Sequence, residues 1–192
     1  MLGYFHYWHG DGPAPLREHG VHCIAPYALQ PAQLSRYRGL LLPAHADQRH
    51  LQTLREPLQD WLAGGGRLVV NGHVAHPFLR WLREFEPSPT RGLEGLRVTL
   101  AQPHPVFAGV AAEDLTFRRG VAGFYARGAN PPPPGAQVLN TLGPQRQPID
   151  WLLALPGGGR LLVHSGNDVW TQGGTAQRVL PQLLAWLRRP AA

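Results

Sequence analysis

The sequence predicts an α/β fold in which a mostly parallel, doubly wound sheet is joined by an antiparallel element. Short apolar runs at residues 39–43 and 67–71 are typical of strands covered on both faces. Between them, residues 47–63 carry leucines and a tryptophan at the spacing of three and four that indicates an amphipathic helix. Strands alternating with helices favour parallel pairing, whereas the irregular middle of the chain, residues 86–148, favours an antiparallel addition.

The first half of the chain supplies four predicted strands and the helices that connect them. The strands are expected at residues 2–8, 21–25, 39–43 and 67–71. The helices are expected at residues 15–19, 31–37, 47–63 and 78–85. Pro57 is expected to kink the long helix, and the three glycines at 64–66 are expected to end it, because glycine tolerates a left-handed closing conformation.

The second half is predicted to be richer in strands. Candidates are residues 96–101, 115–117, 123–125, 137–141, 151–155 and 160–164. Glycines 157–159 lie between the last two and predict a hairpin or a sheet edge, while the prolines at 131–134 predict a stiff extended loop. A final helix is expected at residues 177–188, and the length of 192 residues is that of a single domain, residues 1–192.

Composition excludes several chemistries. All 18 Lys+Arg residues are arginine, so the chain has no lysine for a Schiff base, a pyridoxal phosphate anchor or a P-loop. The single cysteine, Cys23, excludes intrachain disulfides and sites with several cysteine ligands. The net charge of +6 invites a nucleic-acid partner, but the arginines are scattered along the sequence and no recognition motif accompanies them. We therefore expect no specific nucleic-acid partner.

No apolar run approaches the roughly 20 residues of a membrane-spanning helix. The first residues also lack the basic and long apolar regions of a secretory signal. The sequence therefore predicts a cytoplasmic protein without a membrane partner.

Polar side chains follow several of the predicted strands at the point where each strand ends. In open α/β sheets, ligands bind beyond the carboxyl ends of the strands, so these residues form a candidate site. They are His6, Trp8, His9 and Asp11 at the end of the first strand or just after it, His45 and Asp47 likewise for the third, Asn71, His73 and His76 for the fourth, and His164, Ser165, Asn167, Asp168 and Trp170 for the last.

Each of these residues also has a purely structural interpretation. His73 and His76 could be metal ligands, or a cap and a surface side chain, and the aspartates could complete a metal site or cap helices. Ser165 lies outside a Gly-x-Ser-x-Gly turn, which argues against a nucleophile. Cys23 is expected to be a buried structural thiol. The glycine clusters precede strands, so they indicate turns rather than phosphate-binding loops.

Several segments together resemble the class I glutamine amidotransferase-like superfamily and, within it, the ThuA-like (trehalose utilisation) group. They are Tyr-Arg-Gly-Leu-Leu-Leu-Pro at 37–43, Trp-Leu-Ala-Gly-Gly-Gly-Arg-Leu-Val-Val at 61–70, His-Pro-Val-Phe-Ala-Gly-Val at 104–110, Pro-Ile-Asp-Trp at 148–151 and Gly-Arg-Leu-Leu-Val-His-Ser-Gly-Asn-Asp at 159–168. The resemblance implies a flavodoxin-like three-layer sandwich.

The chain departs from this family at its reactive positions. Where amidotransferases place the catalytic cysteine, the turn Asn-Gly-His-Val-Ala at 71–75 carries His73, which implies that glutaminase activity is absent. The acidic segment of the ThuA-like group keeps only Tyr125, and its final histidine is replaced by Asn167.

Three functions follow as hypotheses. The first is a ThuA-like protein that binds or processes a small polar ligand such as a carbohydrate, with His73 as general base, because an imidazole with a pKa near ~6.5 suits proton transfer at neutral pH. The second is a non-catalytic, degenerate amidotransferase-like domain for assembly or regulation, and a homo-oligomer is compatible with either. The third is a metal-dependent hydrolase, although we expect no bound metal or cofactor. The expected ligand-binding residues are His6, His9, His76, Tyr125, Trp151, Asn167 and Asp168.

Overall fold

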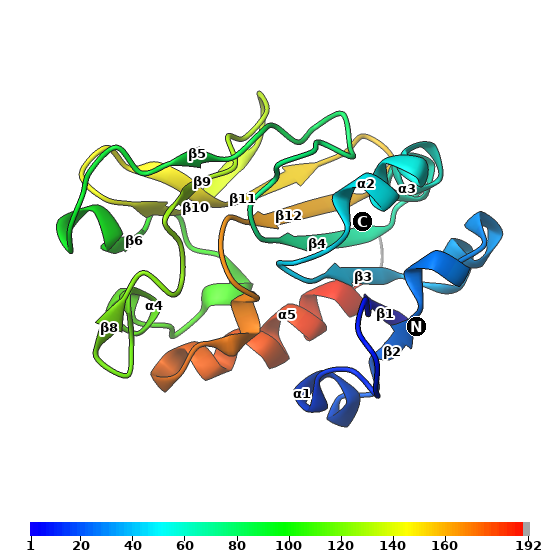
Figure 1. Ribbon diagram of the computed structural model, residues 1–192, viewed down its shortest axis with the longest axis horizontal. Coiled ribbons are helices and arrows are strands. Elements are labelled where there is room, and N and C mark those ends of the chain that lie inside the picture. The colour runs from blue at the N-terminus through cyan, green and yellow to red at the C-terminus, as the bar shows by residue number, and fades with distance from the viewer. Residues whose placement is uncertain (190–192) are drawn as a thin grey trace.

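The computed structural model describes residues 1–189 and shows a mixed α/β fold around an eight-stranded sheet (Figure 1). Five neighbouring strands are parallel. In sheet order they are β2 (His22–Ile24), β1 (Leu2–Phe5), β3 (Gly39–Leu42), β4 (Arg67–Asn71) and β12 (Arg160–His164). The sheet continues with antiparallel pairing through β11 (Gln147–Ala154), β10 (Gln137–Leu142) and β6 (Val98–Leu100). The predicted α/β class, with a mostly parallel sheet and antiparallel strands, is confirmed.

Helices lie on both sides of this sheet. Figure 1 shows α2 (Gln48–Thr53) and α3 (Arg55–Ala63) on one side and α5 (Val179–Arg188) on the other. The shorter helices are α1 (Ala14–Glu18), α4 (Ala112–Thr116) and the 3₁₀ turns Pro26–Ala28, Pro31–Arg36, Glu94–Leu96, Pro105–Phe107, Val169–Thr171 and Gly174–Arg178. Two small ribbons pair β5 (Glu86–Pro87) with β9 (Gly128–Ala129) and β7 (Phe117–Arg118) with β8 (Val121–Ala122).

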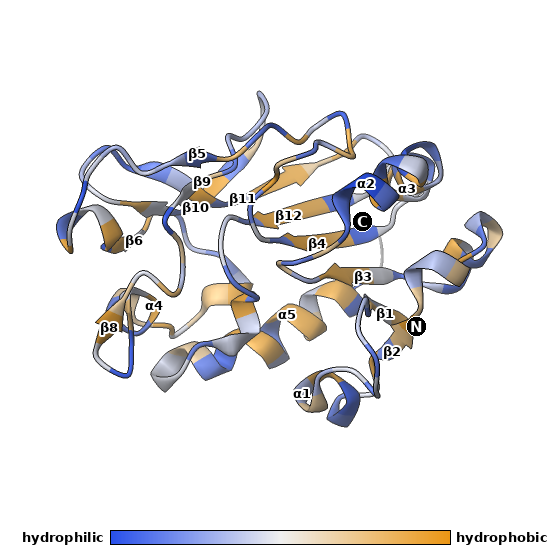
Figure 2. Cartoon of the chain, viewed as in Figure 1, coloured by the Kyte–Doolittle hydropathy of each residue, from blue (hydrophilic) through white to orange (hydrophobic). Residues whose placement is uncertain are grey.

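The middle of β3 and β4 is apolar because both faces of these strands are covered (Figure 2). In β3, Leu41 belongs to the apolar cluster on the side of α5, while Leu40 and Leu42 belong to the cluster on the side of α2 and α3. Val69 and Val70 of β4 divide between the two clusters in the same way. Successive side chains of a strand point to opposite faces, so a run without polar alternation requires two cores. Each fully buried side chain of this size contributes about 1.5–3 kcal/mol.

The predicted hairpin near the end of the chain is confirmed, since β11 and β12 pair antiparallel around the turn that contains Gly158. The long helix over residues 47–63 is interrupted, but at Leu54 rather than at Pro57. Pro57 occupies the first turn of α3, where the missing backbone N–H costs no intrahelical hydrogen bond.

Three local predictions are wrong. Residues 78–85 form an irregular segment with one turn rather than a helix, and Phe78, Leu79 and Leu82 are buried nonetheless, so the apolar spacing reflects burial and not a helical period. Residues 115 and 116 end helix α4, and only Phe117 of this predicted strand lies in one, the short strand β7. Residues 123–125 form a bend, because Gly123 has a φ of +89°, which a strand does not accommodate.

Within residues 1–189, no helix combines the length and apolar character required to cross a membrane.

Candidate functional site

A cavity lies where three neighbouring parallel strands end. The register pairs Leu42 of β3 with Val70 of β4, and Asn71 of β4 with His164 of β12, so the loops that follow these strands start side by side. These loops and the start of α2 enclose about 400 Å³, within the roughly 300–1,000 Å³ typical of small-molecule sites. Its polar lining consists of His45, Gln48, His73 and Asn167.

The turn after β4 depends on Gly72, which lines this cavity. Its φ is +93°, and a Cβ atom at this position would lie 2.2 Å from the carbonyl oxygen of Ala44. Only glycine satisfies both the left-handed backbone and this close approach. The turn therefore presses against the loop after β3 and places His73 at the cavity.

His73 is held by stacking on Phe85, with ring centroids 3.6 Å apart and an angle of 14° between the ring planes. Partial burial, and then electrostatic interactions with His164, His45 and Arg127, lower the pKa of His73 below its usual value of 6.5. The imidazole is consequently neutral at pH 7 and can accept a proton or a hydrogen bond from a ligand.

Gln48 connects α2 to the loop after β4. Its Oε1 accepts hydrogen bonds from the backbone nitrogens of Ala75 and His76, at 2.8 and 2.9 Å. Its Nε2 donates to the carbonyl oxygen of His73 over 2.7 Å. The amide thus orders one wall of the cavity through three bonds to main chain.

Two backbone donors at the strand ends are occupied by the protein's own side chains. Ala44 N donates to Asp168 Oδ1 over 2.7 Å, and Val74 N donates to Asn130 Oδ1 over 2.9 Å. Asp168 is half-buried, and burial raises the pKa of its carboxyl group. These interactions stabilise the loops, and they remove two N–H groups that an anionic reaction intermediate would otherwise use.

Behind the cavity lies a fully buried polar cluster centred on Asp150 (the Asp150 cluster). His164 Nδ1 lies 2.6 Å from Asp150 Oδ1, while Tyr125 and Asn140 donate to Asp150 Oδ2 over 2.7 and 2.8 Å. Burial is also the largest cause that raises the pKa of Tyr125, so its phenol stays protonated and donates to the carboxylate. No described atom forms a hydrogen bond with His164 Nε2.

The second buried cluster surrounds Asn130. The side-chain Nδ2 of Asn130 donates to the carbonyl oxygen of Gly72 over 2.8 Å. The main-chain carbonyl oxygen of Asn130 accepts a hydrogen bond of 2.8 Å from Trp151 Nε1. Asn130 N donates to Ser165 Oγ over 2.9 Å, with Ser165 completely buried. Ser165 therefore has a structural role and no access to a ligand.

The structure brings together only some of the expected ligand-binding residues. His73 and Asn167 line the cavity, and Asp168 supports its wall. Tyr125 and Trp151, expected to face a ligand, are 1% and 0% exposed and lie in the interior with internal partners.

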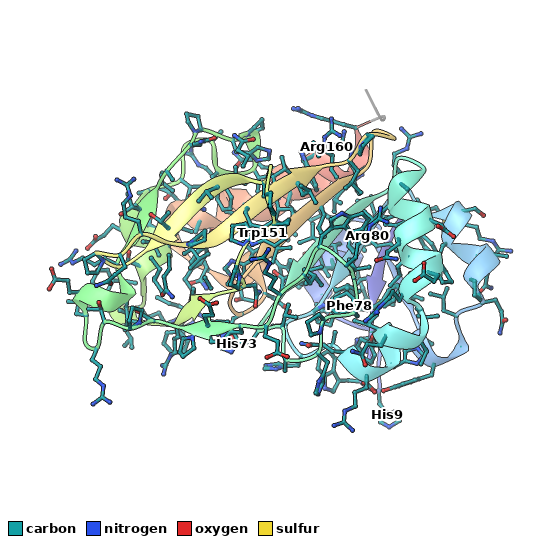
Figure 3. The ribbon with its side chains drawn as sticks, turned by 90° about the horizontal axis from the view of Figure 1, so that it is seen from above. His9, His73, Phe78, Arg80, Trp151 and Arg160 are labelled. Atoms are coloured by element: carbon teal, nitrogen blue, oxygen red, sulfur yellow. The ribbon has the colours of Figure 1, made fainter. Side chains whose placement is uncertain are left out.

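The remaining expected histidines lie outside the lining of this cavity. His6 packs near the rings of Tyr4 and Trp8. His9 is exposed and lies well away from His73 (Figure 3). His76 is exposed and its Nε2 lies 3.5 Å from Arg49 Nε.

Within residues 1–189, no group of three or more histidine, cysteine, aspartate or glutamate side chains is arranged to hold a metal ion. The half-buried thiol of Cys23 donates to the carbonyl oxygen of Asp11, and burial raises its pKa. Cys23 does not line the cavity.

The sequence reasoning missed Gln48 and Asn130 entirely, and it placed His45 at a strand end without selecting it. Gln48 directly follows Asp47, whose side chain caps α2, so its position just inside a helix start was a usable signal. Asn130 lies in an irregular segment before the prolines, where nothing local indicates its contacts across 56 and 58 residues of chain.

No family model matches the chain, and the curated proteins contain no significant match. Among solved structures, the chain is similar to one described as "mmIFT52 N-terminal domain", with a TM-score of 0.58 and 11% sequence identity. That similarity covers 100% of this chain and 99% of the other. At this identity the similarity concerns the fold alone.

Proposed function

We propose that this chain is an amidotransferase-like domain of the ThuA type, with a flavodoxin-like arrangement, which binds a small polar ligand without glutaminase chemistry. The cavity at the ends of β3, β4 and β12 carries the proposal, because imidazole and amide groups line it and an ordered polar wall supports it. A carbohydrate fits such a lining, since its hydroxyls both donate and accept hydrogen bonds.

The absence of a nucleophile at the cavity supports binding over covalent catalysis. The turn after β4 carries His73, Ser165 is enclosed, and Cys23 lies elsewhere in the described chain. The Ala44 and Val74 backbone donors are also bound internally. If the domain processes its ligand, the neutral imidazole of His73 is the group able to accept a proton.

Isothermal titration calorimetry with a panel of mono- and disaccharides tests this proposal. We expect the wild type to bind. His73→Ala should lose about tenfold in affinity, because it removes one hydrogen bond to the ligand, and Asn167→Ala should lose about as much for the same reason. His9→Ala is the matched control, because His9 is exposed and remote from the cavity. Absence of heat with every sugar, or equal losses for the control, would count against the proposal.

A further inference from the structure

Arginines that are scattered in the sequence gather at the amino ends of the parallel strands, the edge of the sheet opposite the cavity. Arg67 begins β4 and is paired directly with Arg160, which begins β12. Arg67 N donates to the carbonyl oxygen of Arg38, the residue before β3. Neighbouring strands lie about 4.8 Å apart, so three arginines start from adjacent points of this edge.

Helix α5 ends at the same edge of the sheet and adds two more arginines there. Arg188 Nη2 donates to the carbonyl oxygen of His19 over 2.9 Å, and Arg189 follows it. The guanidinium of Arg67 lies over the ring of Trp186, 5.1 Å from its centroid. Burial lowers the pKa of Arg67, as do the charges of Arg160, Arg189 and Arg38, which places these groups within electrostatic reach of one another. We call Arg38, Arg67, Arg160, Arg188 and Arg189 the arginine edge.

Among the described residues, no carboxylate pairs with four members of this edge. Among residues 1–189, Arg38, Arg160, Arg188 and Arg189 form no ion pair, since the ion pairs present are Arg17–Asp11 and His164–Asp150. Arg160 uses one nitrogen, Nη1, for the carbonyl oxygens of Gly158 and Gly159. A guanidinium carries five N–H donors, so most of them remain available. Like charges held this close repel one another, and a bound anion would remove that cost.

Two cavities adjoin at Arg38. One encloses about 550 Å³ beside Arg36, Arg38 and Trp61, and the other encloses about 320 Å³ between Arg38 and Arg188. The described lining of both contains arginine and no carboxylate. A concave surface lined by one sign of charge concentrates ions of the other sign.

We propose that the arginine edge binds a small molecule that carries two or more linked phosphate groups. The planar guanidinium donates two parallel hydrogen bonds to a phosphate, which makes arginine suited to this ligand. Arg38 lines both small cavities and Arg188 lines one of them, and hollows of this size favour a compact polyphosphate over a nucleic-acid strand. This site is independent of the function proposed for the cavity at the opposite edge.

Calorimetric titration of the full chain with sodium tripolyphosphate and with ATP tests the proposal. The double variant Arg38→Gln/Arg189→Gln removes two exposed members of the edge. We expect its affinity for tripolyphosphate to fall at least about tenfold, and Arg188→Gln to reduce it independently. The control Arg83→Gln/Arg91→Gln removes the same charge from exposed positions outside both cavities and should stay within about twofold of the wild type.

Circular dichroism melts establish that each variant is folded. An affinity for tripolyphosphate that falls with added NaCl supports the proposal. An affinity that His73→Ala leaves unchanged separates this site from the cavity at the opposite edge. The proposal is overturned if the wild type binds neither tripolyphosphate nor ATP. It is also overturned if the control variant loses as much affinity as the double variant. Binding of single-stranded DNA or anionic phosphatidylserine vesicles at concentrations where tripolyphosphate neither binds nor competes also overturns it.

Discussion

The imidazole of His164 and the carboxylate of Asp150 lie 2.6 Å apart, and neither side chain has any surface exposed to solvent. They belong to neighbouring strands, β12 and β11, and are directly paired in the antiparallel register. The pair therefore joins the parallel part of the sheet to its antiparallel extension, immediately behind the cavity.

We expect Asp150→Ala to destabilise the protein by about 3–5 kcal/mol, because it leaves buried polar partners without an acceptor. His164, Tyr125 and Asn140 all bond to this carboxylate. Urea unfolding followed by circular dichroism measures the change. Asp60→Ala, at an exposed position of α3, is the control. A loss below about 1 kcal/mol would show that the cluster does not stabilise the fold.

Gly72→Ala is expected to be more damaging than Gly10→Ala. Both glycines have similar φ values, +93° and +98°, so both substitutions strain the backbone. A Cβ at Gly72 would meet Ala44 O at 2.2 Å, whereas nothing lies within 4 Å of a Cβ at Gly10. The difference between the two free energies of unfolding isolates the close approach, and we expect about 1–3 kcal/mol. Equal costs for the two variants would refute this account of the turn.

His73 should titrate below pH 6.5, the usual value for histidine, because partial desolvation disfavours its charged form and Phe85 stacks on its ring. Its contribution to stability is therefore fully present above pH 6.5 and is lost as the pH falls through the lowered pKa, since the unfolded chain then binds more protons. NMR titration of the imidazole Hε1 resonance measures the pKa. Phe85→Leu removes the stacking and should move the pKa towards 6.5. A wild-type pKa at or above that value contradicts the prediction.

Asn130→Ala should loosen the turn after β4. The substitution removes the acceptor of Val74 N and the donor to Gly72 O. Amide hydrogen exchange at Val74 is expected to accelerate by about tenfold or more, the equivalent of one lost hydrogen bond. Asn140→Ala is the matched control, because Asn140 bonds to Asp150 instead of this turn. Unchanged exchange at Val74 would mean that Asn130 does not hold the turn.

Local sequence determined the central strands of this protein. The runs at β3 and β4 lack polar alternation, which is compatible with a sheet covered on both faces, and the glycine-containing turn between β11 and β12 indicated a hairpin. Segments whose shape depends on distant contacts could not be predicted in this way. Phe78, Leu79 and Leu82 have helix-like spacing, yet they lie in an irregular segment and are buried in the cluster that the central strands form with α2 and α3.

The candidate site was likewise predictable only in part. The rule that ligands bind beyond strand ends selected His73 and Asn167, which do line the cavity. Tyr125 and Trp151 were expected to face a ligand because of the family resemblance, but residue type does not reveal which way an aromatic ring points, and both rings are buried.

The sequence by itself determined the α/β class, the absence of lysine chemistry and the lack of a thiol after β4, because these follow from composition and short-range pattern. Only the tertiary structure decided which charges become neighbours. Arg38, Arg67 and Arg160 are separated by long stretches of chain, and the parallel register alone places them at one edge. The same register brings His164 of β12 beside Asn71 of β4, so that Asp150 and its partners lie behind the cavity. Pairing between strands is a long-range property, and it determines both edges of this sheet.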